Sequence, residues 1–147
     1  MEITIDEWII HYLAEKNKII IESEILEKIY KKCDKFVILK GERFFRKISR
    51  FEKESKDRVS IILVKNFIRR FIRNSNKTIL LEDSDVMDLP DDLEKITPGK
   101  DKFLVKTALL TKDKLILTTD AKLKEKINGM HGLNIVLIDE FIISYDC

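Results

Sequence analysis

Acidic residues that follow short apolar runs are the feature of this sequence that points most directly to chemistry. Asp6 directly follows one such run and Asp120 follows another, while Glu42 comes one short turn after a third. Asp101 precedes the apolar segment that leads towards Asp120. Carboxylates gathered in one place repel each other and need a cation, and hard oxygen ligands favour Mg²⁺ or Mn²⁺. A metal held in this way lowers the pKa of a bound water and binds phosphoryl oxygens, which suits phosphodiester hydrolysis.

The apolar runs have the length and composition of strands that are covered on both faces. The predicted strands are residues 3–5, 36–39, 78–81, 115–118 and 134–138. Because strands alternate with segments of helical period, we expect an α/β fold with three layers, α/β/α, around a mainly parallel sheet of about five strands. The chain has 147 residues, with only four Gly and two Pro and no flexible linker. We therefore expect a single domain over residues 1–147.

The intervals between the predicted strands carry helical patterns. We expect an apolar stripe from Trp8 to Leu13, a helix N-capped by Ser23, helices beginning near Gly41, near residues 55–57 and near Lys100, and a helix capped by Asp120 that runs to Ile127. Residues 82–94 contain seven acids and no base, and we expect solvated loops at 82–85 and 88–92. The alternative is that the first of these loops supplies an extra metal ligand.

These elements determine where the acidic residues would meet. In a parallel sheet, ligands bind beyond the carboxyl ends of the strands, where the connections diverge. Asp6, Glu42 and Asp120 are each expected at that edge, and Asp101 is expected to open a helix nearby. The sequence therefore predicts that four carboxylates share one pocket and that they act together as metal ligands and catalytic residues.

Basic residues are concentrated in one segment, although the net charge of the chain is only +2. Residues 43–73 contain eleven Lys or Arg and three acids. Bases alternate with aromatics over residues 65–73, a pattern that suits binding of a phosphate backbone. An amphipathic helix with its arginines in water is the alternative reading. The candidate RNA-binding residues are Arg43, Arg46, Lys47, Arg69, Arg70 and Arg73.

The order of the acidic motifs resembles the PIN-domain family, including its stand-alone VapC-like ribonucleases. The resemblance covers essentially the whole chain. It is carried by Ile-Asp6 after the first strand, Val-Ile-Leu-Lys-Gly-Glu42-Arg, Asp101-Lys-Phe-Leu-Val-Lys-Thr-Ala-Leu and Leu-Thr-Thr-Asp120. It implies that the four acids bind one or two Mg²⁺ or Mn²⁺ ions and that the protein cleaves RNA. It also implies that Thr118 shapes the loop, that the protein forms a homodimer and that an antitoxin-like protein is a partner.

Other readings of the same residues remain open. The family usually follows its first Asp with Thr or Ser and then Asn or Ser, whereas Glu7 and Trp8 follow Asp6 here. A catalytically weak or inactive PIN-like module that binds RNA or protein is therefore the main alternative. DNA as the substrate and a phosphate-accepting receiver domain are further alternatives. Taken singly, Asp120 could act only as an N-cap, and Asp101 could only favour a helix N-terminus.

The cysteine content and the length of the apolar runs indicate where in the cell the protein is expected. The two cysteines are too few for a disulfide framework and lack metal-ligand spacing. No apolar run approaches the roughly 20 residues that a membrane-spanning helix needs. We therefore expect a cytoplasmic protein with no membrane segment.

Overall fold

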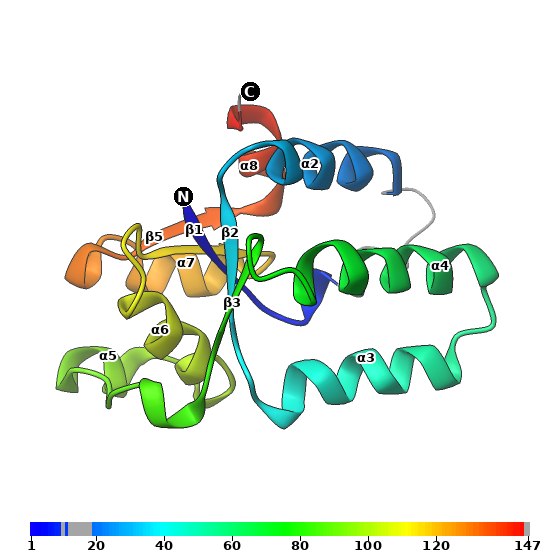
Figure 1. Ribbon diagram of the computed structural model, residues 1–147. Helices are drawn as coiled ribbons and strands as arrows, with labels where there is room; N and C mark the ends of the chain where they lie inside the picture. The colour runs from blue at the N-terminus through cyan, green and yellow to red at the C-terminus, as the bar shows by residue number, and fades with distance from the viewer. Residues whose placement is uncertain (10, 12–18, 146–147) are drawn as a thin grey trace.

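The centre of the protein is a five-stranded sheet in which all neighbouring strands are parallel (Figure 1). The computed structural model describes residues 1–9, 11 and 19–145. The strand order is β3-β2-β1-β4-β5, and the strands are β1 (Glu2–Ile5), β2 (Lys35–Leu39), β3 (Thr78–Leu81), β4 (Leu115–Thr118) and β5 (Asn134–Leu137). The predicted α/β class and five-stranded sheet are confirmed, and the strand bounds agree with the expected ones to within one residue.

The chain enters the sheet at its centre. It adds β2 and β3 on one side of β1, then crosses over and adds β4 and β5 on the other side. This change of direction makes the gap between the carboxyl ends of β1 and β4 a topological switch point, where open parallel sheets bind ligands. The register pairs Ile5 with Leu117, so Asp6 and Thr118 leave the sheet at the same level.

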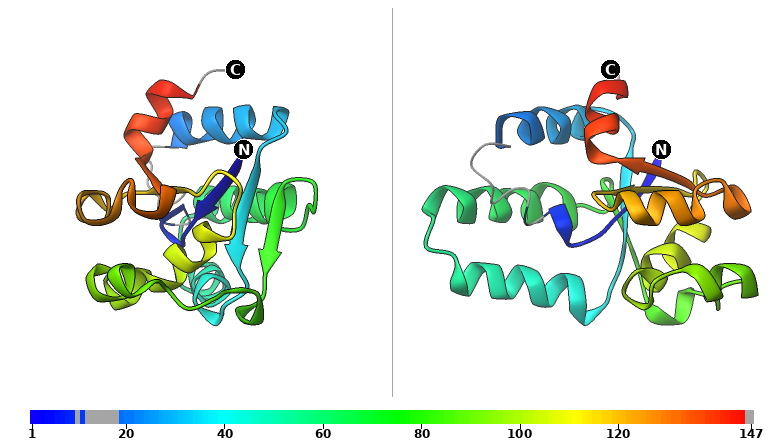
Figure 2. Two further views of the ribbon diagram at one scale, coloured as in Figure 1. Left: turned by 90° about the vertical axis from the view of Figure 1, so that its left-hand side faces the viewer. Right: turned by 180° about the vertical axis from the view of Figure 1, so that it is seen from behind.

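Helices cover both faces of the sheet and complete three layers (Figure 2). One apolar cluster joins the sheet to helices α2, α3, α4 and α8, and a second joins it to α5, α6 and α7. The helices are α2 (Ile19–Lys31), α3 (Glu42–Glu54), α4 (Arg58–Phe67), α5 (Asp91–Ile96), α6 (Lys102–Leu109), α7 (Ala121–Ile127) and α8 (Ile138–Ser144). Helices α3 and α4 form a hairpin that projects beyond the sheet (Figure 1).

Several helix predictions need correction. Ser23 lies inside α2, which already begins at Ile19, because the buried stripe of a helix does not fix its first residue. Helix α5 occupies part of the segment expected to be a loop, with Leu93 as its buried anchor. Helix α8 was not predicted, although Ile138 and Phe141 are buried at helical spacing. The stripe from Trp8 to Leu13 falls mostly outside the described residues.

The basic helix is also not uniform. Helix α4 ends at Phe67 and continues as a π-helical turn, η1 (Ile68–Ile72). A π turn inserts one extra residue per turn and changes the direction of the side chains that follow it. Arg69 and Arg70 of this turn are adjacent in sequence, so they point to different sides, as neighbouring residues do in any helix.

None of the helices described is both long enough and apolar enough to cross a membrane.

We predict that Phe71→Ala lowers the free energy of unfolding by about 3–5 kcal/mol, because it removes a ring from the centre of the larger core. Phe71 is buried, and its ring centroid lies 5.2 Å from that of Phe36, 5.4 Å from that of Phe67 and 5.7 Å from that of Tyr30. Urea unfolding followed by circular dichroism measures the change. Ile62→Ala, at an exposed position of α4, is the control and should change stability by less than about 0.5 kcal/mol. Equal effects of the two substitutions would contradict the packing described here.

Candidate functional site

Asp120 lies at the start of α7, and its two carboxylate oxygens contact different groups. Its Oδ1 accepts a hydrogen bond of 3.1 Å from the backbone N–H of Leu123, which caps the helix. Its Oδ2 lies 3.3 Å from Nζ of Lys100. Partial burial raises the pKa of Asp120, but the Leu123 hydrogen bond and the Lys100 ammonium outweigh this and hold the pKa below its ordinary value. Asp120 is therefore the N-cap of α7, as predicted from the sequence. Its second carboxylate oxygen faces the ammonium group of Lys100.

The loop before Asp120 is fixed by a threonine. The backbone N–H of Asp120 donates a hydrogen bond of 3.1 Å to Oγ1 of Thr118, and Thr118 is buried. This contact helps to fix the course of the chain between β4 and α7.

Asp101 is the second acid that meets Lys100. It ends the short turn η3 (Gly99–Asp101) before α6, and only 7% of its surface is exposed. Its side chain makes no capping hydrogen bond to α6, so a helix-capping role does not explain its burial. Nζ of Lys100 lies 4.0 Å from Oδ2 of Asp101. Asp101 and Asp120, which come from different elements, thus share one ammonium group.

Asp6 follows β1 at the same edge of the sheet. Its Oδ1 accepts a hydrogen bond of 2.6 Å from the backbone N–H of Glu7. Asp6 lines a cavity of about 420 Å³ whose walls include Phe44 of α3, Phe103 of α6 and Asp83. Asp83, from the turn after β3, is thus a further acid that lines the same cavity as Asp6. Residues 82–85 are exposed, in agreement with the predicted solvated loop, and Asp83–Asp85 form a short 3-10 turn.

Glu7 and Trp8, the departures from the PIN motif, are both integrated into the fold. Glu7 is buried, and its Oε1 lies 3.2 Å from Nζ of Lys47. Nε1 of Trp8 donates a hydrogen bond of 2.9 Å to the carbonyl oxygen of Leu117 in β4. Trp8 therefore ties the segment after β1 to the neighbouring strand, and Lys47 is held by an acid next to Asp6.

Glu42 begins α3 directly after Gly41, as expected, but its side chain and that of Arg43 lie outside what the structure describes. Among the described residues, no group of three or more His, Cys, Asp or Glu side chains is arranged as a metal site. The donor chemistry nevertheless fits a hard divalent cation. All the candidates are carboxylates, and a positive charge already lies against two of them.

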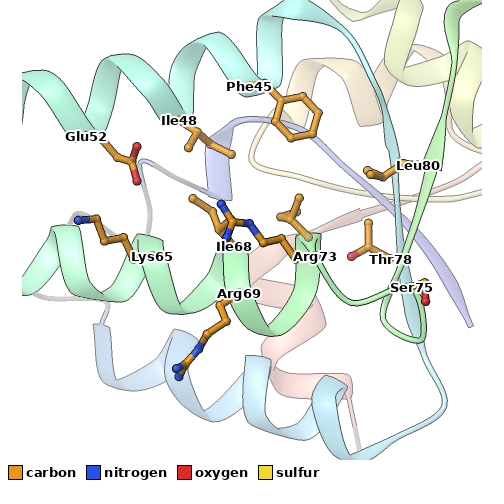
Figure 3. A pocket seen from close by; sticks show the side chains of 11 residues that line it. Phe45, Ile48, Glu52, Lys65, Ile68, Arg69, Arg73, Ser75, Thr78 and Leu80 are labelled. Atoms are coloured by element: carbon orange, nitrogen blue, oxygen red, sulfur yellow. The ribbon is translucent and has the colours of Figure 1, made fainter.

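The candidate RNA-binding arginines differ in their surroundings (Figure 3). Arg73 extends into a groove of about 920 Å³ between α3 and α4, which has a mostly apolar floor and also contains Lys65. Arg69 is exposed and points away from α3. Arg70 instead pairs with Glu27 at 2.8 Å, and its guanidinium lies 4.2 Å from the ring centre of Tyr30. Arg46 is exposed on α3.

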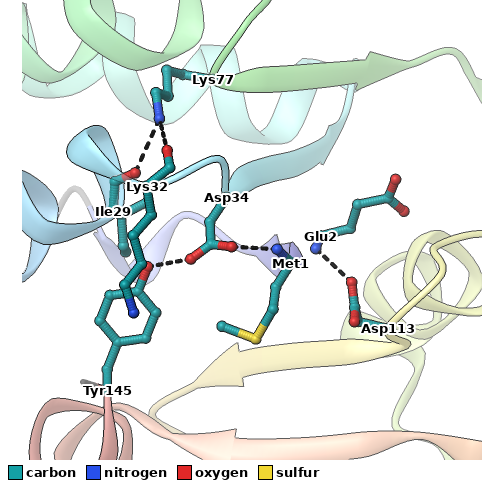
Figure 4. A network of polar contacts seen from close by, with 8 residues as sticks. All are labelled: Met1, Glu2, Ile29, Lys32, Asp34, Lys77, Asp113 and Tyr145. Atoms are coloured by element: carbon teal, nitrogen blue, oxygen red, sulfur yellow. Dashed lines mark hydrogen bonds and ion pairs between the residues drawn. The ribbon is translucent and has the colours of Figure 1, made fainter. Parts of the chain in front are cut away.

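A separate polar network lies at the opposite, amino-terminal edge of the sheet (Figure 4). Asp34, just before β2, accepts hydrogen bonds from the Met1 amino group and from the Tyr145 hydroxyl. Burial raises the pKa of Asp34, but these two hydrogen bonds outweigh it, and the pKa lies below its ordinary value. The network joins the two ends of the described chain to the sheet and is far in the topology from the acids discussed above. Its role is structural.

Comparison with models of protein families, with curated proteins and with solved structures finds no match to this chain.

We predict that Asp34→Asn destabilises the protein by about 1–2 kcal/mol at neutral pH, because it replaces a charged acceptor of two hydrogen bonds. An acid whose pKa is lowered by folding contributes stability above its unfolded pKa of about 4, and the contribution disappears as the pH falls through the folded pKa. The difference between wild type and variant should therefore shrink below about pH 4. Urea unfolding at a series of pH values measures it. A constant difference down to pH 2 would contradict the assigned charge.

Proposed function

We propose that the protein is a metal-dependent endoribonuclease that hydrolyses RNA phosphodiester bonds at a centre formed by Asp6, Glu42, Asp101 and Asp120. One observation carries the proposal: Asp101 and Asp120, from different elements, direct carboxylate oxygens at the same positive charge near the sheet's topological switch point. Such an arrangement of carboxylate oxygens is suited to holding a hard divalent cation.

Each residue has a distinct task in this proposal. The carboxylates of Asp101 and Asp120 would hold Mg²⁺ or Mn²⁺, with Asp6 and Glu42 completing the set. Thr118 keeps Asp120 in position through the backbone of the loop. When bound, the ion supplies positive charge for the phosphoryl oxygens and a water of lowered pKa. The carboxylates also favour removal of a proton from the attacking water, and the cleaved ester oxygen gains a proton in turn.

The basic surface supports RNA as the substrate. Arg46, Arg69 and Arg73 are exposed and belong to the segment with eleven Lys or Arg and three acids. Exposed cations of this kind bind a phosphate backbone without sequence preference. The proposal includes a cytoplasmic setting, and it includes a homodimer and an antitoxin-like partner on the strength of the resemblance alone.

A module that binds RNA or protein without cleaving is the second candidate. The groove around Arg73 favours it, because its apolar floor and cationic rim could hold a partner independently of the acids. The ion pair of buried Glu7 with the partly exposed Lys47 also favours it, since Glu7 after Asp6 differs from the usual PIN motif. Calorimetric titration with Mn²⁺ separates the two candidates, because the binding module does not require metal at the acids.

We expect Asp101→Asn and Asp120→Asn each to lower RNA cleavage in Mg²⁺ or Mn²⁺ by about 100-fold or more, since each removes a charged ligand. Asn at position 120 still caps a helix, so this variant should fold normally. The matched control is Asp139→Asn, at an exposed acid in the first turn of α8, and it should keep full activity. Gel analysis of a labelled RNA, with and without EDTA, measures cleavage. Equal rates in wild type and both site variants would reject the nuclease proposal.

The surroundings of the arginines give a second prediction, which concerns RNA binding alone. Arg69→Ala and Arg73→Ala should each weaken binding of single-stranded RNA and lower the slope of log K against log salt by about 0.7 per lost phosphate contact. Arg70→Ala should have a smaller effect, because its guanidinium is already paired with Glu27.

Fluorescence anisotropy at several KCl concentrations, in EDTA to prevent cleavage, makes this comparison. Lys126→Ala, at an exposed position of α7 on the other face of the sheet, is the control. Equal losses for all four variants would show that the RNA does not follow this surface.

A further inference from the structure

Lys100 places a positive charge beside two of the acids proposed as metal ligands. Its Nζ lies 3.3 Å from Oδ2 of Asp120 and 4.0 Å from Oδ2 of Asp101. The other oxygen of Asp120 caps α7 through Leu123. The oxygen of Asp120 that is not engaged by its helix is therefore the one that meets the lysine, and a metal bound to that oxygen would need the same space.

The lysine can leave this position without disturbing the fold. Its side chain is 62% exposed, although the neighbouring Asp101 is buried. A lysine carries its charge on a flexible four-carbon stem, so the ammonium can move into water while the backbone of turn η3 stays in place. The acids, in contrast, are fixed by the helix cap and by burial. A metal ion could therefore replace the ammonium group of Lys100 more easily than it could displace either carboxylate.

We propose that Lys100 is a built-in counter-ion that competes with the divalent cation for Asp101 and Asp120 and so sets the metal concentration that the protein requires. The inference rests on the proposed function, because it takes these acids as the metal ligands. Without metal, the ammonium relieves the repulsion between the two carboxylates. When metal binds, the ammonium is displaced, and the loss of its contacts with Asp101 and Asp120 reduces the net metal affinity.

If Lys100 has this role, one substitution should lower the stability of the metal-free protein and raise its affinity for metal. Lys100→Met removes the counter-ion, so the melting temperature of the metal-free protein should fall. The same change removes the competitor, so Mn²⁺ should bind more tightly, by about three- to tenfold for a pair as exposed as this one. A lysine that only supported the fold would lower stability without raising the affinity for metal.

The experiment is calorimetric titration of the full chain with MnCl₂, combined with thermal unfolding in EDTA and in MnCl₂. Lys100→Arg keeps the charge and should stay within about twofold of wild type in Mn²⁺ affinity. Lys122→Met, at an exposed position in the first turn of α7, removes a lysine charge from the same neighbourhood and should also stay within about twofold. If circular dichroism shows Lys100→Met to be misfolded, Lys100→Gln takes its place.

The outcomes separate the inference from the function on which it rests. Tighter Mn²⁺ binding by Lys100→Met, but not by Lys100→Arg or Lys122→Met, supports the counter-ion role. If wild type binds Mn²⁺ and Lys100→Met binds it equally or less well, the inference is overturned while the metal centre stands. If neither wild type nor any variant binds Mn²⁺, the metal centre is overturned, and the inference with it.

Discussion

The mutual repulsion of carboxylates at one edge of a parallel sheet is the constraint that shapes the region around Asp101 and Asp120. Parallel strands deliver all their carboxyl ends to one edge, so acids that follow different strands are brought close together whatever their distance in sequence. Lysine side chains of the same chain reduce part of that repulsion. Lys100 meets Asp101 and Asp120, and Lys47 meets the buried Glu7. Three of the acids near this edge of the sheet are therefore paired with lysines.

The fold could be inferred from the sequence because its strands are short, apolar and separated by clear helical periods. All five strands lie where the pattern places them. The helices were harder to predict where local signals conflict. The strand β5 passes directly into α8, so its apolar run hides the start of the helix at Ile138. Helix α5 is short and highly acidic, and only the burial of Leu93 distinguishes it from a solvated loop.

The site was predictable to a lesser degree, for a physical reason. Residue order and strand ends indicate which acids approach the edge, but they contain no information on which cation meets them. Lys100 is adjacent to Asp101 in sequence, yet nothing in that adjacency indicates contact with Asp120. Arg69 and Arg70 are likewise neighbours with the same chemistry. Both lie in the π turn η1, but Arg70 pairs with Glu27 of α2 whereas Arg69 is exposed.

The central position of β1 has a consequence for the order in which the protein can assemble. Its neighbour β2, and β3 beyond it, are complete by residue 81, whereas its other neighbour β4 begins only at Leu115. During synthesis, three adjacent strands can pair before β4 exists, and the hydrogen bond between Trp8 and Leu117 must wait for it. The surroundings of Asp6 are therefore completed only when the later half of the chain docks against the earlier half. A newly made, partly folded chain would lack Asp101 and Asp120 and could not carry out the proposed chemistry.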